Sequence, residues 1–278
     1  MGSIAFISIV LSRIVDVALI NTSDLRIQVP LPERYLNASF DELGQMIATA
    51  KKTLGKQLLI LGHHYQRDEV IEYADMRGDS YKLAAFAGEN ANAKNIIFCG
   101  VHFMAESCDV LTEPDQHVYL PDLNAGCSMA DMASESSVID AWNILGKIVG
   151  EENIIPITYM NSSAAIKSFV GEHGGAVCTS SNAKKILEWA LDRAKHILFI
   201  PDQHLGRNTA LEMGYTLEDC MLYDPRMSFA LDKAKVTSST FWLWKGHCTT
   251  HQRFSVEQVE EFRNNYPGGK VIVHPECK

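Results

Sequence analysis

Two cysteines, Cys127 and Cys248, stand out among the residues able to do chemistry, because each follows a short apolar stretch at a matched place in the chain. The chain holds seven cysteines and no CxxC pair, which argues against a disulfide scaffold and a compact zinc knuckle. Soft thiolates far apart in sequence suit an iron–sulfur cluster or zinc. Four others are expected to pack as small core hydrophobes: Cys99, Cys108, Cys178 and Cys220.

Polar side chains suited to binding and proton transfer follow other apolar runs. They are His63, Tyr65, Tyr159, Asn161, His274 and Glu276. Ser80 and Ser180 precede helical patterns, and there a free hydroxyl and a helix N-terminus can together hold a carboxylate. Each residue also has an ordinary alternative, since serine is a common N-cap and a buried histidine or tyrosine can simply be hydrogen-bonded in the core.

The elements that must position these residues are short apolar strands separated by amphipathic helices. Strands are expected at 58–66, 95–103, 117–127, 154–163, 196–206, 241–248 and 270–277, and helices at 80–91 and 181–194. Strands alternating with helices predict an α/β fold with parallel sheets. Because ligands bind outside the carboxyl ends of parallel strands, the polar residues above are expected to lie at one edge of each sheet.

The order of elements repeats. The separation of Ser80 from Ile97 equals that of Ser180 from Ile197, and each unit reads as a first strand, a serine-capped helix, a middle strand and a last strand leading to cysteine. The predicted organisation is an N-terminal segment (1–50), a first αβα unit (51–127), a second (128–248) and the start of a third (249–278), incomplete in this chain. Packing around a pseudo-threefold axis would let the strand ends converge on one cavity.

Composition limits the function classes. A hydrophobic content of 46% with 21% charged residues is ordinary for a globular protein. The net charge of −9 argues against nucleic-acid binding. The apolar N-terminal stretch is interrupted by Arg13 and Asp16 and predicts an irregular strand or helix rather than a membrane span. Free thiols favour a cytoplasmic location, or a plastid in a plant.

Several motifs in order resemble the quinolinate synthase family. They are GHHYQ, GDS, FCGVHFMAES, AGCSMADM, ITYMNSSAAIKS, CTSSNA, PDQHLGRN, WKGHCTTH and VHPEC, spanning about Leu58 to Cys277. The resemblance implies three αβα units and a [4Fe-4S] cluster that acts as a Lewis acid. It implies condensation of iminoaspartate (iminosuccinate) with dihydroxyacetone phosphate to quinolinate in NAD biosynthesis, with L-aspartate oxidase or aspartate dehydrogenase as the iminoaspartate source.

The resemblance also implies roles for residues of this chain. Cys127 and Cys248 would be cluster ligands, and His63, Tyr65 and Glu276 would serve in proton transfer. The substrate-binding positions would be His63, Ser80, Tyr159, Asn161, Ser180, His274 and Glu276. The family's third cluster cysteine lies beyond the HPE motif and is absent from this chain, and Cys277 does not match it by position.

Two other functions remain open at this point. One is an inactive two-unit remnant that binds dicarboxylates or a partner protein. The other is a zinc-dependent lyase or hydrolase that uses the same cysteine and histidine side chains. If 278 residues were the whole protein, the cluster could not be held in the family's usual way and the strand at 270–277 would lack neighbours.

Overall fold

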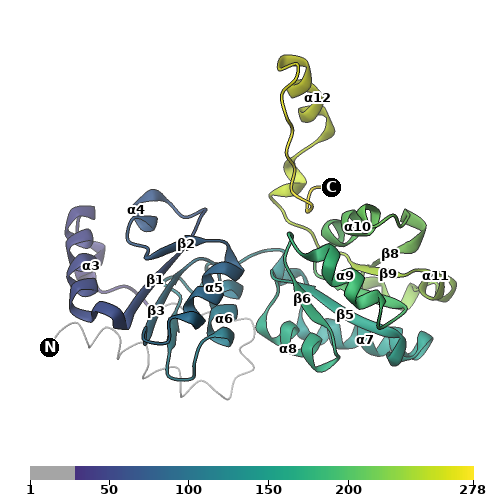
Figure 1. The fold of residues 1–278 in the computed structure, drawn as a ribbon, viewed down its shortest axis with the longest axis horizontal. Helices are drawn as coiled ribbons and strands as arrows, with labels where there is room; N and C mark the ends of the chain where they lie inside the picture. The colour runs from purple at the N-terminus through teal and green to yellow at the C-terminus, as the bar shows by residue number, and fades with distance from the viewer. Residues whose placement is uncertain (1–28) are drawn as a thin grey trace. The chain divides into compact units, whose positions relative to one another are not determined.

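The polypeptide forms two compact units, and the boundary between them in the sequence falls between Gly126 and Cys127 (Figure 1). The computed structural model describes residues 29–278, so the strand or helix expected in the apolar N-terminal stretch lies outside the described residues. Each unit holds one sheet whose paired strands all run parallel. The α/β class with repeated αβα units is thereby confirmed.

The first unit contains a four-stranded sheet in the order β2-β1-β3-β4. Its strands are β1 (Leu58–His63), β2 (Met76–Gly78), β3 (Asn95–Cys99) and β4 (His117–Tyr119). Its helices are α2 (Glu33–Leu36), α3 (Phe40–Leu54), α4 (Asp68–Ile71), α5 (Ser80–Glu89) and α6 (His102–Leu111). The boundary expected after residue 50 falls inside α3, which begins with a capping box between Ser39 and Glu42.

The second unit contains a five-stranded sheet in the order β6-β5-β7-β9-β8. Its strands are β5 (Ile154–Tyr159), β6 (Ala176–Cys178), β7 (His196–Ile200), β8 (Cys220–Tyr223) and β9 (Phe241–Trp244). Its helices are α7 (Glu135–Val149), α8 (Ala164–Glu172), α9 (Ala183–Leu191), α10 (Gln203–Glu212), α11 (Lys233–Ser238) and α12 (Val256–Asn265).

The two sheets share the predicted repeat. In each unit the first, middle and last strands lie side by side, as β1-β3-β4 and as β5-β7-β9. The registers correspond as well, with Leu58 paired to Asn95 and Ile154 paired to His196. Strands β2, β6 and β8, each of three or four residues, were not among the expected strands.

The prediction that serines cap the helices of the repeat is wrong. The N-cap of α5 is Asp79, whose carboxylate accepts a hydrogen bond from the backbone N–H of Lys82 at 2.9 Å. Helix α9 begins only at Ala183, after an N-cap Asn182 that makes no side-chain capping bond. An aspartate satisfies a free N–H as well as serine does and adds a favourable charge at the helix start. The hydroxyls of Ser80 and Ser180 therefore do not cap these helices.

Apolar residues cover both faces of the second sheet. All five residues of β7 and all four of β9 are buried, which is typical of strands with helices on both sides. On one face, Trp242 and Trp244 pack in a cluster with Trp142 of α7 and Ile166 of α8. The indole N–H groups of Trp242 and Trp244 donate to the carbonyls of Val236 and Met132, at 3.1 and 2.9 Å. These two bonds tie β9 to α11 and to the segment before α7.

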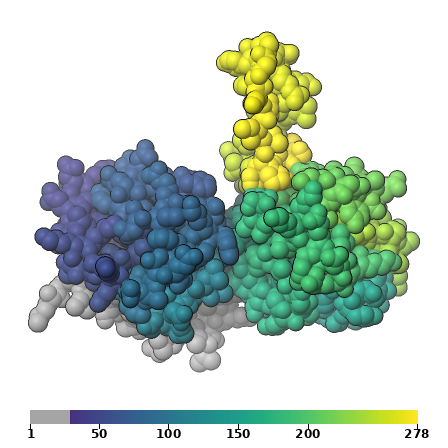
Figure 2. Space-filling model, in the orientation of Figure 1, coloured from purple at the N-terminus to yellow at the C-terminus, as the bar shows by residue number. Residues whose placement is uncertain are grey.

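The prediction of a strand at 270–277 is wrong. Residues 270–273 are irregular and 274–277 form a turn, closed by a bond from the Cys277 N–H to the His274 carbonyl at 2.9 Å. Val271, Ile272 and Val273 are exposed, at 36%, 93% and 65%. No strand pairs with this run in the described residues, and an unpaired strand leaves its backbone groups unsatisfied. Helix α12 likewise buries none of its residues and protrudes from the second unit (Figure 2).

Across residues 29–278, every helix is too short or too polar to cross a bilayer.

Candidate functional site

The site in the second unit forms around the buried carboxylate of Glu276. The hydroxyl of Tyr159 is hydrogen-bonded to Glu276 and to Ser180. Tyr159 is the last residue of β5 and is 7% exposed, and Glu276 is 4% exposed. Burial, followed by the charge of Glu276, raises the pKa of Tyr159 well above its usual value. Three predicted substrate-binding residues, far apart in the chain, are therefore in direct contact.

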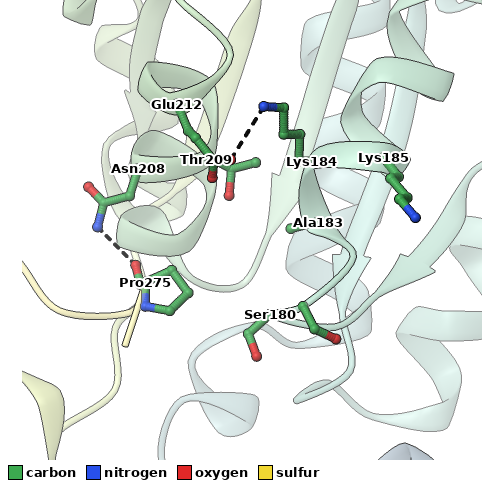
Figure 3. Close-up of a pocket in the computed structure, with 9 residues that line it drawn as sticks. Ser180, Ala183, Lys184, Lys185, Asn208, Thr209, Glu212 and Pro275 are labelled. Carbon is green, nitrogen blue, oxygen red and sulfur yellow. Dashed lines mark hydrogen bonds and ion pairs between the residues drawn. The ribbon is translucent and has the colours of Figure 1, made fainter. Parts of the chain in front are cut away.

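Asn208 on α10 holds the segment that carries Glu276. Its side-chain Nδ2 donates to the carbonyls of Pro275 and Cys277, both at 2.9 Å. The first of these bonds is drawn in Figure 3. Two bonds from one amide fix the turn although it belongs to no sheet. The turn also bonds the backbone N–H of Glu276 to Nδ1 of His274 at 3.3 Å.

Two histidines flank the carboxylate. Nε2 of His251 lies 3.4 Å from Oε2 of Glu276, and Nδ1 of His274 lies 3.8 Å from Oε1. The two imidazole rings stack with centroids 4.8 Å apart. Burial lowers the pKa of His274, and the His251 ring lowers it further while the Glu276 charge opposes both. His274 was predicted here, whereas His251 was not singled out from the other histidines.

The two predicted cluster ligands, Cys127 and Cys248, are both half-buried in this unit. Burial raises the pKa of Cys127, and the charge of Cys248 contributes in the same direction. The residues that follow the two cysteines are hydrogen-bonded to each other, with the hydroxyls of Ser128 and Thr249 3.1 Å apart. The loop before Cys248 passes so close to Pro201 that a Cβ on Gly246 would collide with the Pro201 carbonyl. Glycine is therefore required for the path that delivers Cys248.

The other cysteines divide by burial. Cys108 and Cys178 are fully buried, as expected, and burial raises the pKa of Cys108 to about 12. Cys99 and Cys220 are only half-buried, so their expected place in the core is correct only in part. Cys277 is half-buried with its Sγ 3.4 Å from Nδ1 of His251.

A cavity of about 290 Å³ opens beside the Glu276 turn (Figure 3). Its walls include Ser180, Lys184 and Lys185 from the α9 region, Asn208 from α10, and Pro275. Lys184 pairs with Glu212 across 3.3 Å, while both are largely exposed. Lysine ammonium groups and a serine hydroxyl suit an anionic group.

Asn161 lies half-buried in the bend after β5.

The first unit presents its predicted residues at the carboxyl edge of its own sheet. His63 ends β1 and is 6% exposed, whereas His64 is exposed, so only one of the neighbours faces inward as expected. Burial, aided by the charge of His64, lowers the pKa of His63 to about 4. The ring of Tyr65 lies 4.0 Å from that of His63, and its hydroxyl points to the Met104 sulfur at 3.9 Å. Ser80 is half-buried at the start of α5.

Asp202 is a buried carboxylate that the sequence did not identify. It follows β7, is fully buried, and accepts bonds from the backbone N–H groups of Leu205 and Cys248. Burial is the main cause that raises its pKa to about 7, and the nearby Glu276 adds to this. Its Oδ2 has no hydrogen-bond partner in the described residues. The signal for Asp202 would have been its position at a strand end; the signal for His251 was its spacing three residues after Cys248.

Fold and site together define an α/β protein of repeated parallel-sheet units, with thiol, imidazole, phenol and carboxylate groups gathered at a strand-end edge. The family model described as quinolinate synthetase A protein matches residues 45–278. The chain belongs to this family.

Named relatives agree with the family match. Quinolinate synthases from Acidobacterium capsulatum and Corynebacterium glutamicum are each 54% identical, over 88% and 90% of this chain. The quinolinate synthase of Bacillus subtilis is 51% identical over 89% of the chain. The matched regions cover 66%, 64% and 67% of these three relatives, so the chain spans about two thirds of their length or slightly less.

Proposed function

We propose that this protein condenses iminoaspartate with dihydroxyacetone phosphate to form quinolinate, with loss of phosphate and two waters. The observation that carries the proposal is the contact of Tyr159 with Ser180 and with the buried Glu276, within a chain that belongs to the quinolinate synthetase A family. All three residues lie at or beside the carboxyl edge of the second sheet, where α/β proteins bind small molecules.

Cys127 and Cys248 fit an iron–sulfur cluster by the chemistry of their donors. Both thiols are half-buried, and Cys248 is close enough to Cys127 for its charge to raise the pKa of Cys127. Thiolate ligands in a partly shielded position are those that iron–sulfur clusters use. We assign these two cysteines as ligands of a [4Fe-4S] cluster. When bound, the cluster supplies an iron that polarises a hydroxyl or carboxylate oxygen of the substrate.

Anionic groups of the substrates need hydrogen-bond donors and positive charge. The hydroxyl of Ser180, the N-terminus of α9, and Lys184 and Lys185 supply both at the wall of the cavity in Figure 3. Iminoaspartate carries two carboxylates, and dihydroxyacetone phosphate carries a phosphate. We assign one carboxylate of iminoaspartate to Ser180 and Tyr159.

Formation of the carbon–carbon bond and of the aromatic ring requires proton transfers. Glu276 is the assigned general base, because its carboxylate is buried and has His251 and His274 beside it. His63, whose pKa is about 4, is neutral near pH 7 and serves as a neutral imidazole rather than as a charged acid. Tyr65, exposed at 52%, is the assigned proton donor in the first unit.

The test is quinolinate formation by protein reconstituted anaerobically with iron and sulfide, supplied with both substrates. Glu276→Gln is expected to lower kcat by at least about 100-fold, the size of effect usual for loss of a general base. Glu257→Gln on the exposed α12 is the matched control and should retain full activity. Equal rates in the two variants would refute the assigned base. A colourless, metal-free protein that binds dicarboxylates without turnover would instead support the inactive remnant.

A further inference from the structure

The PDQHLGRN motif covers the start of α10, and no step of the proposed reaction uses its first polar residues, Asp202, Gln203 and His204. Asp202 is the N-cap of the helix, and its carboxylate accepts a hydrogen bond from the backbone N–H of Leu205 at 2.7 Å. Asp202 and His204 are buried, and Gln203 is half-buried. Helix capping accounts for the Leu205 bond alone, so the other contacts of this turn have a different purpose.

Asp202 and Gln203 hold the segment that carries Cys248, called here the cysteine loop (residues 245–252). The backbone N–H of Gln203 and its side-chain Nε2 both donate to the Gly246 carbonyl, at 3.0 and 3.2 Å. The carboxylate of Asp202 accepts from the backbone N–H of Cys248. Asp202 and Gly246 also pair as an isolated parallel bridge. The loop is therefore fixed at the cysteine and two residues before it.

His204 holds the cysteine loop at a point after the cysteine. Its Nε2 lies 2.6 Å from the side-chain amide nitrogen of Gln252, within hydrogen-bond distance. The backbone N–H of Gln252 in turn donates to the Cys248 carbonyl at 3.1 Å. Three consecutive residues of one helical turn thus contact the loop before, at and after its cysteine.

The polar character of this turn is not explained by stability. Oδ2 of Asp202 and Nδ1 of His204 are buried and have no hydrogen-bond partner in the described residues. A buried polar atom without a partner costs free energy of folding, and an apolar side chain would avoid that cost. A requirement for placing the cysteine loop does account for polar residues at these positions.

Helix α10 can fix other segments because it lies close against the buried strands. A Cβ on Gly206 would come within 2.7 Å of the Leu243 side chain on β9 and within 2.8 Å of the Phe199 side chain on β7, so only glycine allows this approach. The same helix holds the turn that carries Glu276, through the two bonds from Asn208. One helix thereby supports both the cysteine loop and the Glu276 turn.

We propose that Asp202, Gln203 and His204 are positioning residues that fix the thiol of Cys248 before metal is bound. The inference rests on the proposed function, because this thiol is one of the two assigned there to the iron–sulfur cluster. Residues that hydrogen-bond around a metal ligand orient it. A ligand that is already ordered also loses less conformational entropy when the metal binds.

The test measures how fast each cysteine of the full 278-residue chain reacts with iodoacetamide at one pH, after a chelator has removed bound metal; peptide mass spectrometry assigns the labels. Gln203→Ala removes the side-chain bond to Gly246. We expect Cys248 to react about fivefold faster, because loss of one hydrogen bond shifts a local opening equilibrium by about that factor. The rates of Cys220 and Cys178, in the same unit, should not change. General destabilisation would instead accelerate Cys178, which is fully buried and reacts only when the unit opens.

Asn153→Ala is the matched control, because it also removes a bond from a side-chain amide to a backbone carbonyl, that of Val149 at 2.8 Å. Asn153 precedes β5 and therefore lies at the opposite edge of the parallel sheet from the cysteine loop. Its variant should leave the rate of Cys248 unchanged.

Gln252→Leu breaks the contact with His204 from the side of the loop and should accelerate Cys248 selectively as well. It keeps the proposal testable if Gln203→Ala fails to fold, which circular dichroism checks. An unchanged Cys248 rate in a folded variant, or equal acceleration of Cys248 and Cys178, would overturn the proposal. Neither iron nor turnover is measured, so this outcome is separate from that of the synthase test.

Discussion

Tyr159 links the end of a buried strand to the carboxylate at the centre of the site. Its hydroxyl bonds to Glu276 and Ser180, and the residue is 7% exposed. Tyr159→Phe removes that hydroxyl and leaves a buried carboxylate with one donor fewer. We expect the free energy of unfolding to fall by about 1–3 kcal/mol and quinolinate formation to fall as well. Urea denaturation measures the first effect and the synthase assay the second.

Tyr223→Phe provides the matched control for this change. Tyr223 lies on β8, is 1% exposed, and is separated from β5, the strand of Tyr159, by β7 and β9. Its variant should leave quinolinate formation unchanged. If the two variants lose activity equally, the contact between Tyr159 and Glu276 has no role in the reaction.

His63 makes the stability of the first unit depend on pH. Its pKa is about 4 in the folded protein, because burial disfavours the charged ring, and near 6.5 when unfolded. The unfolded chain therefore binds more protons between these values, so His63 contributes full stability above about pH 6.5 and loses it as the pH falls toward 4. We expect urea midpoints to drop between pH 7 and pH 5, and His63→Asn to reduce that drop. An identical pH dependence in the variant would contradict the buried, neutral state.

At the scale of elements, Asn208 of α10 holds the turn at 274–277, which pairs with no strand. Asn208→Ala removes both bonds, to Pro275 and Cys277. We expect hydrogen exchange to accelerate at Glu276 and Cys277, because the turn that carries them loses both bonds. Asn90→Ala, which removes a side-chain bond to the Phe86 carbonyl in the first unit, should leave exchange at these two residues unchanged. The same response in both variants would contradict this role.

Whether a strand could be predicted from the sequence depends on how much apolar surface it buries. The strands β1, β3, β5, β7 and β9 were predictable because buried parallel strands are continuous apolar runs. The run Val271–Val273 has the same composition but forms no strand, since pairing depends on a neighbour that composition does not reveal. The capping of α5 by Asp79 instead of Ser80 was also hidden, because either residue caps equally well.

For the whole molecule, the repeat was visible in the sequence because the two sheets use one order of strands. The proximity of Tyr159, Ser180 and Glu276 was expected from the family resemblance and from the strand predicted at 270–277, which does not form. The turn that carries Glu276 is held instead by Asn208, a tertiary contact that the sequence does not reveal. His251 and Asp202 could not be singled out, since their importance arises from neighbours distant in the chain. Convergence of the units on one cavity stays a prediction.

The iron content of cysteine variants after anaerobic reconstitution with iron and sulfide tests the central claim most directly. The claim is that Cys127 and Cys248, which lie in one unit with Glu276, bind the iron–sulfur cluster. We predict a brown wild-type protein that takes up iron, near-complete loss of iron in both Cys127→Ser and Cys248→Ser, and retention in Cys178→Ser, whose thiol is fully buried. Equal iron content in all three variants, or a wild type that binds no iron, would contradict it.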